Sequence, residues 1–544
     1  MRNYFWKGFF IFFISLSCLD INSQTHYWIF FSDKDGVEFN PYTYFDTATI
    51  RKRLKKGIEL NQYSDFPLRS DYISKVEKIT GNKSISQSRW LNAMTIEATP
   101  IHIDQIRQEL FVTDIIEIRS ESNTMDKDID SLFRGDKHDL LDLQLKSLGI
   151  KYFEQHKVNG KGVRIAVFDA GFPDVDKSSV FEHLIKEKRI IATYDFVKKD
   201  SFVYDYHTHG TKVLACIAGK FGKHQFGLAT GAEFLLARTE IKRETFSEEE
   251  NWLCAVEWAD KNGADIISSS LGFTFRRYFQ QQMDGKYTLV SRAANIAASK
   301  GILVINAAGN DGLNYWEVIC APADADSILT VGAVSPKTGY HEVYSSLGPT
   351  YDGRMKPNVC AFGHVVTSDG KKIKTAYGTS LATPLISGFA ACVLQMNPDW
   401  DNMRILNEIQ KSSHLYPYFD YAHGYGVPQA SYFTGEEKIS RPSFSFAMQN
   451  DSLKIFLVEG SGKIKEITRN KKDGFYKKNC CNNFYDLDKD YLYYKITADS
   501  DKKIRRYGVI NMKGYDSFNM SKINFNKNET ITVYYKGFVD NKKF

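Results

Sequence analysis

The chain of 544 residues is long enough for two to four domains. Apolar residues make up 43% and charged residues 25% of the sequence, as in globular proteins with a substantial core. The formal net charge of +6 is small, and the basic residues form no continuous stripe, which argues against a nucleic-acid-binding protein.

The first 23 residues have the pattern of a signal peptide. Arg2 and Lys7 precede an apolar run at 9–16 that is too short to anchor the chain in a bilayer, and we expect cleavage after Ser23. Cys18 leaves a lipoprotein as the alternative, although the residues before it lack the usual aliphatic side chain. No later stretch has the roughly 18 consecutive apolar residues of a membrane span.

The cysteines do not suggest a disulfide framework. Eight occur in the sequence, and seven remain if Cys18 leaves with the signal peptide. Five of them are scattered through apolar segments, while Cys480 and Cys481 are adjacent and poorly placed to bridge to each other. The pattern indicates buried free thiols.

Residues 25–118 are predicted to form a small α+β module, because strand-like and helix-like runs alternate there. Its predicted elements are a strand at 27–31, a basic helical patch at 50–56, a helix at 101–110 and a strand at 112–118. Residues 119–140 are rich in Asp, Ser and Lys with few apolar side chains, so they are predicted to form an exposed linker.

Residues 141–436 are predicted to form a parallel sheet covered by helices on both faces, because continuous apolar runs alternate with helical stretches. The runs predicted as strands are 163–168, 234–237, 266–267, 303–306 and 329–331, and the clearest helices are 248–262 and 289–300. Active sites in such sheets lie at the carboxyl ends of the strands. Residues 437–544, with alternating runs such as 530–535, predict a small antiparallel β module.

Ser380 stands at the start of a predicted helix rich in small residues. A serine there lies beside backbone N–H groups that have no helical partner and can hold a developing oxyanion. Gly378 permits a tight turn before it, and Pro384 is expected within about the first turn, where a missing N–H costs little. The simpler alternative for this residue alone is a helix N-cap, for which serine is favoured.

Asp169 and His209 also stand at the ends of predicted elements. Asp169 follows the buried strand at 163–168, and an acid at the carboxyl end of a strand can orient a histidine ring through its N–H. The alternative is ordinary Asp-x-Gly turn chemistry. His209 opens an apolar helix and is suited to proton transfer near neutral pH, with His207 as the nearest competitor.

Asn310 follows the strand predicted at 303–306. Its side-chain amide can donate a hydrogen bond to an oxyanion, although Asn310-Asp311-Gly312 is also a strong turn signal. Each of the four candidate residues is weak evidence by itself.

The order and spacing of these residues are far more specific. Asp169 precedes His209 by 40 residues, and His209 precedes Ser380 by 171. Asp, His, Ser is one of three chain orders known for this triad. It argues against an esterase or lipase with a Gly-x-Ser-x-Gly motif, because that class has a different order. With Ala-Ala-Gly-Asn at 307–310 and Gly-Thr-Ser-x-Ala-x-Pro at 378–384, the chain resembles the subtilisin-like serine proteases, or subtilases, over roughly 141–436.

The resemblance implies a three-layer α/β fold with a mainly parallel sheet and a secreted endopeptidase that acts on proteins or peptides. It implies a catalytic triad of Asp169, His209 and Ser380, with Asn310 in the oxyanion hole. Ser270, Leu271 and Gly272 match the strand that pairs with the substrate backbone, and Gly309 is expected at the same cleft. Asp311 is expected at the rim of the P1 pocket, or else is a solvated turn carboxylate.

The resemblance also suggests what the N-terminal module does. Residues 25–118 correspond to a propeptide that assists folding and inhibits the enzyme in cis, as in secreted Bacteroidetes subtilases. Self-cleavage is then expected in the linker at 119–140, and a permanently attached accessory domain is the alternative. A non-catalytic protein-binding scaffold derived from a subtilase is the alternative for the whole chain.

Three residues depart from the family pattern. Ala170 replaces a hydroxyl residue, Lys212 replaces a second histidine, and Leu381 replaces methionine, the last with little change in volume. None of them carries triad chemistry, so we expect an altered optimum rather than lost activity. The chemistry requires no cofactor, and no loop has an Asp/Asn pattern that assigns a structural calcium site.

Overall fold

The computed structural model describes residues 24–118, 137–241, 247–274, 277–435, 441–449, 452–458, 490–521 and 525–544. The predicted signal peptide and residues 119–136 of the predicted linker lie outside the described residues. The chain divides into two compact units, and residues 40–62 belong with the peptidase-like unit rather than with the N-terminal one. The predicted module at 25–118 therefore differs from the structure in this respect.

The first unit is built on one antiparallel sheet in the order β2-β3-β1-β4. Ile29 of the central strand faces Met94 on one side and Ile115 on the other, so its neighbours bury an apolar face together with Val76 and Ile106 from the helices. The elements are β1 (Thr25–Phe31), α3 (Ser70–Thr80), β2 (Ser86–Ser88), β3 (Ala93–Ala98), α4 (Pro100–Ile106) and β4 (Val112–Ile118).

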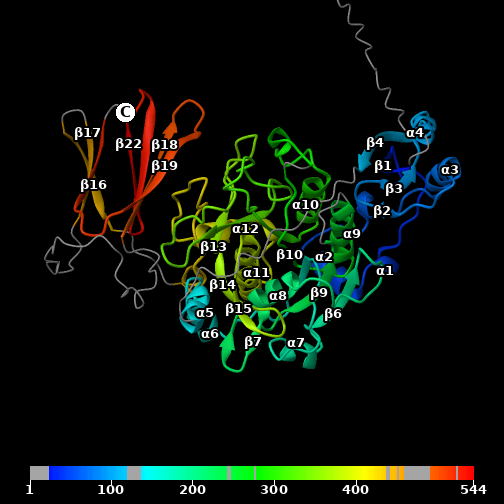
Figure 1. The fold of residues 1–544 in the computed structure, drawn as a ribbon, viewed down its shortest axis with the longest axis horizontal. Coiled ribbons are helices and arrows are strands. Elements are labelled where there is room, and N and C mark those ends of the chain that lie inside the picture. Colours follow the sequence, from blue (N-terminus) through cyan, green and yellow to red (C-terminus); the bar gives the residue numbers. More distant parts are fainter. Residues whose placement is uncertain are drawn as a thin grey trace, which may run out of the picture. The chain divides into compact units, whose positions relative to one another are not determined.

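Residues 40–62, here called the clasp, leave the first unit and return to it. The clasp contains the short helix α1 (Pro41–Tyr44) and α2 (Thr47–Lys55). Asp46 caps α2 by accepting a hydrogen bond from the Thr49 N–H at 2.5 Å, and basic residues fill the last turn, as the helix dipole favours. Figure 1 shows α2 next to α9 of the second unit.

The second unit contains a seven-stranded parallel sheet in the order β13-β12-β11-β10-β5-β9-β6 (Figure 1). Five of its strands coincide with the apolar runs in the sequence, which confirms the predicted α/β fold. The strands are β5 (Arg164–Asp169), β6 (Ile190–Asp195), β9 (Glu233–Arg238), β10 (Ile266–Ser269), β11 (Leu303–Ala307), β12 (Leu329–Val334) and β13 (Val359–Phe362).

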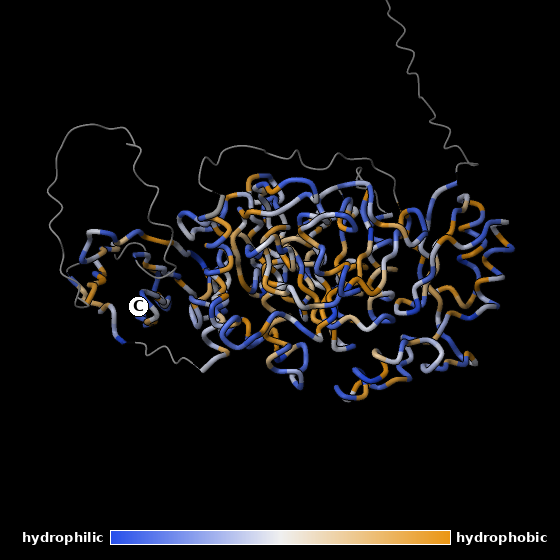
Figure 2. Tube along the Cα trace, turned by 90° about the horizontal axis from the view of Figure 1, so that it is seen from below, coloured by the Kyte–Doolittle hydropathy of each residue, from blue (hydrophilic) through white to orange (hydrophobic). Residues whose placement is uncertain are grey.

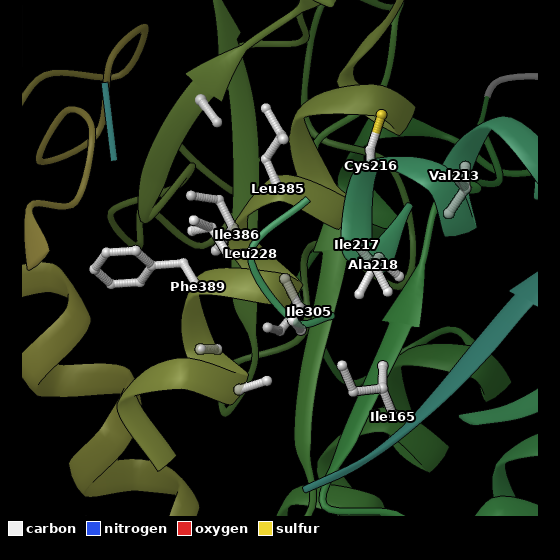
Figure 3. Packing of buried hydrophobic residues seen from close by; sticks show 14 of the residues in the cluster. Ile165, Val213, Cys216, Ile217, Ala218, Leu228, Ile305, Leu385, Ile386 and Phe389 are labelled. Carbon is white, nitrogen blue, oxygen red and sulfur yellow. The ribbon is translucent and has the colours of Figure 1, made fainter. Parts of the chain in front are cut away.

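Helices cover both faces of this sheet. Alternate residues of β5 show the division, because Ile165 packs in the cluster that contains α8 and α11, whereas the Phe168 ring meets Trp252 of α9 at 6.0 Å. Figure 3 shows the first of these interfaces, and Figure 2 shows hydrophobic residues concentrated along the inner part of the unit. The main helices are α8 (His209–Ala218), α9 (Ser247–Lys261), α10 (Leu289–Ser299), α11 (Thr379–Met396) and α12 (Asn402–Ser412).

Smaller elements complete this unit. They are α5 (Lys137–Lys146), α6 (Ile150–Gln155), α7 (Glu182–Lys186), β7 (Lys220–Phe221), β8 (His224–Gln225), β14 (His364–Ser368) and β15 (Ile373–Tyr377), with one-turn 3₁₀ helices at Tyr63–Asp65 in the first unit and at Gln280–Gln282 and Ala430–Thr434 here. Helix α11 is long and apolar enough to cross a bilayer, yet 89% of that stretch is buried inside the protein, as expected of a core helix.

The C-terminal residues form two small antiparallel sheets, in the orders β16-β17-β20 and β19-β18-β21-β22. The predicted run at 530–535 lies in β21, whose Ile531 and Val533 enter the module's own core. The strands are β16 (Phe444–Gln449), β17 (Ser452–Leu457), β18 (Tyr491–Ala498), β19 (Ile504–Asn511), β20 (Ser517–Ser521), β21 (Glu529–Tyr535) and β22 (Phe538–Lys543).

A buried polar network lies where these strands meet the peptidase-like part of the unit. The Tyr534 hydroxyl donates to the His414 carbonyl at 2.6 Å. Asp420 is fully buried, and its carboxylate lies 3.0 Å from Nδ1 of His423. The other nitrogen of that ring, Nε2, accepts the backbone N–H of His341 at 3.0 Å. Burial, followed by the nearby His423, lowers the pKa of His341 to about 4.

This network predicts acid sensitivity of the folded unit. Because the pKa of His341 is about 6.5 when unfolded and about 4 when folded, the unfolded state binds the proton more strongly. The contribution is fully present above about pH 6.5 and is lost as the pH falls to 4, by roughly 3 kcal/mol. Urea unfolding of a Ser380→Ala chain should therefore show a midpoint that falls over this range.

The matched variant is His341→Gln, whose amide can still donate to the Ser345 carbonyl that His341 Nε2 contacts at 2.7 Å. It should flatten the fall of the midpoint, whereas His156→Gln, at an exposed position, should leave it unchanged. An equal pH slope in His341→Gln and the parent would contradict the prediction.

Candidate active site

The site begins at Asp169, the last residue of β5. Its carboxylate is completely buried and accepts the Ala170 N–H at 2.8 Å. Gly171 has φ 129°, and a side chain at Gly210 would collide with the Gly171 carbonyl, so only glycine allows the start of α8 to approach the strand end this closely.

His209 is the first residue of α8 and lies between the other two candidates. Its Nδ1 is 2.8 Å from Asp169 Oδ1, and its Nε2 is 3.0 Å from Ser380 Oγ. A carboxylate at Nδ1 fixes the proton on that nitrogen, which leaves Nε2 free to accept from the serine hydroxyl. The His209 side chain is 21% exposed, so the ring is reachable from solvent while the Asp is not. The competitor His207 lies beside it, with ring centroids 6.4 Å apart.

Ser380 is the second residue of α11, directly after Gly378 and Thr379. Gly378 has φ 131°, and a Cβ there would lie 2.9 Å from Ser380 Oγ, so the residue two positions before Ser380 must be small. The structure corrects the expected position of Pro384, which lies inside the helix rather than in its first turn. Proline lacks the N–H that would bond to the Ser380 carbonyl, and the Ser270 hydroxyl donates to that carbonyl instead, at 2.9 Å.

Asn310 follows β11 and faces the start of α11. Its Oδ1 accepts hydrogen bonds from the Thr379 N–H at 2.9 Å and the Thr379 hydroxyl at 3.0 Å. With Oδ1 occupied, the amide Nδ2 is the group left to donate, and it lies on the side of Gly378. The Ser380 N–H is in the first turn of α11, where backbone donors have no helical acceptor. The two N–H groups together can bind a negatively charged oxygen.

The expected substrate-side residues lie close to one thiol. Ser270, Leu271 and Gly272 follow β10, and side chains placed on Gly272 or Gly309 would meet Cys320 Sγ, the latter at 3.3 Å. Cys320 therefore lies between the two segments that the sequence analysis selected. The Asp311 carboxylate accepts from Asn314 Nδ2 at 2.6 Å within the following turn.

Thr379, Cys320 and the hydroxyl of Ser270 acquire their roles only in the structure. Thr379 was visible as part of a motif, but its bond to Asn310 joins residues 69 positions apart. Cys216, Cys320, Cys360 and Cys392 are buried free thiols, as predicted. Among the described residues, no three His, Cys, Asp or Glu side chains are grouped so that they could hold a metal ion.

Asp, His and Ser side chains bonded in series near the carboxyl ends of the strands of a parallel sheet are an arrangement found in serine hydrolases. Comparison with known families makes the assignment specific. Residues 160–426 match the subtilase family (Peptidase S8), and residues 26–131 match a Peptidase S8 propeptide domain of Bacteroidota. The chain therefore contains a subtilase (Peptidase S8) domain, preceded by a domain of the Peptidase S8 propeptide type.

Individual relatives agree with this family. The chain is 30% identical over 273 residues to the serine protease AprX of Bacillus subtilis, covering 44% of this chain and 59% of AprX. It is 29% identical over 260 residues to subtilisin BL of Lederbergia lenta, covering 47% and 85% of the two chains. The chain spans about three fifths of the length of the first relatives it matches.

A solved structure supports the fold. Fervidolysin from Fervidobacterium pennivorans, a keratinolytic enzyme related to subtilisin, aligns over 94% of this chain and 70% of its own with a TM-score of 0.54. The sequence identity of 15% limits this likeness to the fold.

The position of Cys320 generates a prediction about its reactivity. Burial, followed by the nearby charges of Asp311 and Asp324, raises the pKa of the Cys320 thiol, and a thiol that stays protonated is a poor nucleophile. Iodoacetamide at pH 8 should leave Cys320 unmodified in the native protein and alkylate it after unfolding. Peptide mass mapping measures this, with Cys254, which is not fully buried, as the internal comparison. Equal native labelling of the two cysteines would contradict the prediction.

Proposed function

We propose that the protein is a secreted serine endopeptidase made as a self-processing zymogen. The series of contacts from Asp169 through His209 to Ser380, at 2.8 and 3.0 Å, is the observation that carries the proposal. In such a series the histidine removes the serine proton while the carboxylate stabilises the imidazolium that forms.

The reaction follows from this geometry. Ser380 Oγ attacks the peptide carbonyl, and its proton moves to His209 Nε2. The new oxyanion accepts hydrogen bonds from Asn310 Nδ2 and the Ser380 N–H. The tetrahedral intermediate expels the amine, which takes the proton from His209, and an acyl-enzyme remains. Water then repeats the sequence of steps and releases the acid.

Substrate recognition uses mainly backbone. Ser270, Leu271 and Gly272 follow β10 and are proposed to pair with an extended peptide, which gives affinity with little demand on its side chains. Gly309 leaves room beside this segment, and the Cys320 thiol lies next to both Gly272 and Gly309. The carboxylate of Asp311 is held in its own turn, which favours the structural role for this residue over a role in P1 selection.

The match to a propeptide domain supports the zymogen. We propose that residues 25–118 inhibit the enzyme in cis, that self-cleavage falls in 119–140, and that residues 1–23 direct export, with lipidation at Cys18 as the less favoured fate. No nucleic-acid partner is proposed.

A non-catalytic binding scaffold is the competing function. A serine-reactive phosphonate separates the two, because covalent attachment requires a serine activated by its histidine. Labelling at Ser380 in the processed protein supports the enzyme. An unlabelled Ser380 in a folded, processed protein supports the scaffold.

Replacing Ser380 with Ala tests catalysis and processing together. Peptide hydrolysis should fall by on the order of 10⁶-fold, the loss measured for subtilisin itself. The precursor should also keep its N-terminal module, which intact mass and N-terminal sequencing of the secreted protein detect. Unchanged hydrolysis, or processing at the same site by the purified variant alone, would contradict the proposal.

Thr379→Val tests how the oxyanion donor is oriented. The variant preserves shape but removes the hydroxyl that donates to Asn310 Oδ1, while the backbone N–H of residue 379 still holds the amide. We expect kcat/KM to fall roughly tenfold through kcat, against about 10²–10³-fold for Asn310→Ala, the range known from subtilisin. A larger loss in Thr379→Val than in Asn310→Ala would show that the threonine acts in another way.

A further inference from the structure

The clasp lies on the peptidase-like unit although the chain on both sides of it belongs to the first unit. It carries five basic and two acidic residues, so its net charge is +3. The surface beneath it is formed by the carboxyl-terminal ends of α9 and α10, which carry the negative ends of two helix dipoles. The charges of the segment and of its site are therefore complementary.

The contacts with α9 are specific and largely buried. Arg53 forms a salt bridge with Asp260 at 2.5 Å, and the two side chains are only 3% and 6% exposed. Lys52 donates to Asp265 at 2.5 Å and to the Gly263 carbonyl at 2.7 Å. One ammonium group that donates to both a carboxylate and a carbonyl just past the end of α9 forms charge-assisted hydrogen bonds, and both acceptors would otherwise need water.

The clasp and the ends of α9 and α10 are also sterically complementary. Gly263 and Gly301 end α9 and α10 with φ of 69° and 80°. A Cβ on Gly263 would lie 2.8 Å from Thr49 Oγ1, and one on Gly301 would lie 2.5 Å from Ile58 Cδ1. Both glycines thus adopt the left-handed conformation that commonly ends a helix, and their lack of a side chain lets the clasp approach the backbone of the peptidase-like unit. At the far end of the clasp, Lys300 donates to Gln62 at 2.7 Å.

The clasp site lies at the amino ends of the sheet strands, whereas the triad lies at their carboxyl ends. Arg164 begins β5 and contacts Asp46 of the clasp at 3.2 Å, whereas Asp169 ends the same strand at His209. Six residues of parallel strand separate the two by roughly 17 Å. Occupation of the clasp site therefore does not compete with a peptide at Ser380.

We propose that the clasp is a second anchor, independent of the active site, that keeps the N-terminal module attached to the peptidase after the linker is cut. This rests on the proposed function only in supposing that the linker is the natural cleavage segment. The partner of the site is the protein's own basic helix α2, and release requires breaking the buried Arg53–Asp260 pair or a second cut beside the clasp.

The test uses the full chain with Ser380→Ala and a recognition sequence for a site-specific protease inserted within 119–136. After that protease cuts, size-exclusion chromatography at about 150 mM salt should show the N-terminal fragment eluting with the remainder. Arg53→Gln should raise the dissociation constant by on the order of 10²–10³-fold, because it leaves Asp260 buried without its partner. Lys52→Gln, which replaces a partly exposed residue, should give a smaller increase.

Lys55→Gln is the matched control, since it makes the same charge change on the same helix. Lys55 pairs with Asp399, but the two side chains are 56% and 83% exposed, so the loss should not alter retention. Raising the salt should release the Arg53→Gln fragment before that of the parent. Equal retention in Arg53→Gln and the parent, or release of the fragment from the parent at low salt, would overturn the proposal. This test uses a Ser380→Ala chain cut by an added protease, so it does not depend on self-processing. A failure of the proposed self-processing would be seen only in the chain that keeps Ser380.

Discussion

The buried carboxylate of Asp169 determines how the peptidase-like unit must be assembled. A charge without access to water is costly unless hydrogen bonds compensate it, and here the compensation comes from the Ala170 N–H and the ring of His209. Both donors must therefore be held at the end of β5. The glycines at 171 and 210 make this approach sterically feasible, and the small residues of α11 let Ser380 reach the same point from the other side.

Helix α11 shows how a core element can also serve the site. An interior proline would ordinarily disrupt a buried helix, because the carbonyl four residues earlier loses its donor. That carbonyl belongs to Ser380, and the Ser270 hydroxyl satisfies it from the loop after β10. The same bond joins the backbone of the proposed nucleophile, Ser380, to the segment proposed to bind substrate, so the position of one constrains the position of the other.

The sequence is sufficient for the parts of this protein that depend on local pattern. Apolar runs reveal β5, β9, β10, β11 and β12, and the motif around Ser380 reveals the start of α11. Strands β6 and β13 lie at the two edges of the sheet and are missing from the predicted strands. Only the last residue of β6 is buried, so no continuous apolar run marks it, and β13 is buried but only four residues long. Two contacts join residues that are far apart in the chain, so no local pattern encodes them. They are the hydrogen bond between Thr379 and Asn310 and the approach of the Cys320 thiol to Gly272.

The clasp was visible in the sequence only as a basic helical patch. Its placement has a consequence for the order in which the chain assembles. The strands of the first unit all lie within residues 25–118, so that sheet can form as soon as this stretch is available. Arg53, however, must wait for Asp260, 207 residues later, before its charge can be buried. Contacts of such long separation form late, because the loop between them has to be closed. One of the first helices to be synthesised is thus among the last to find its final place.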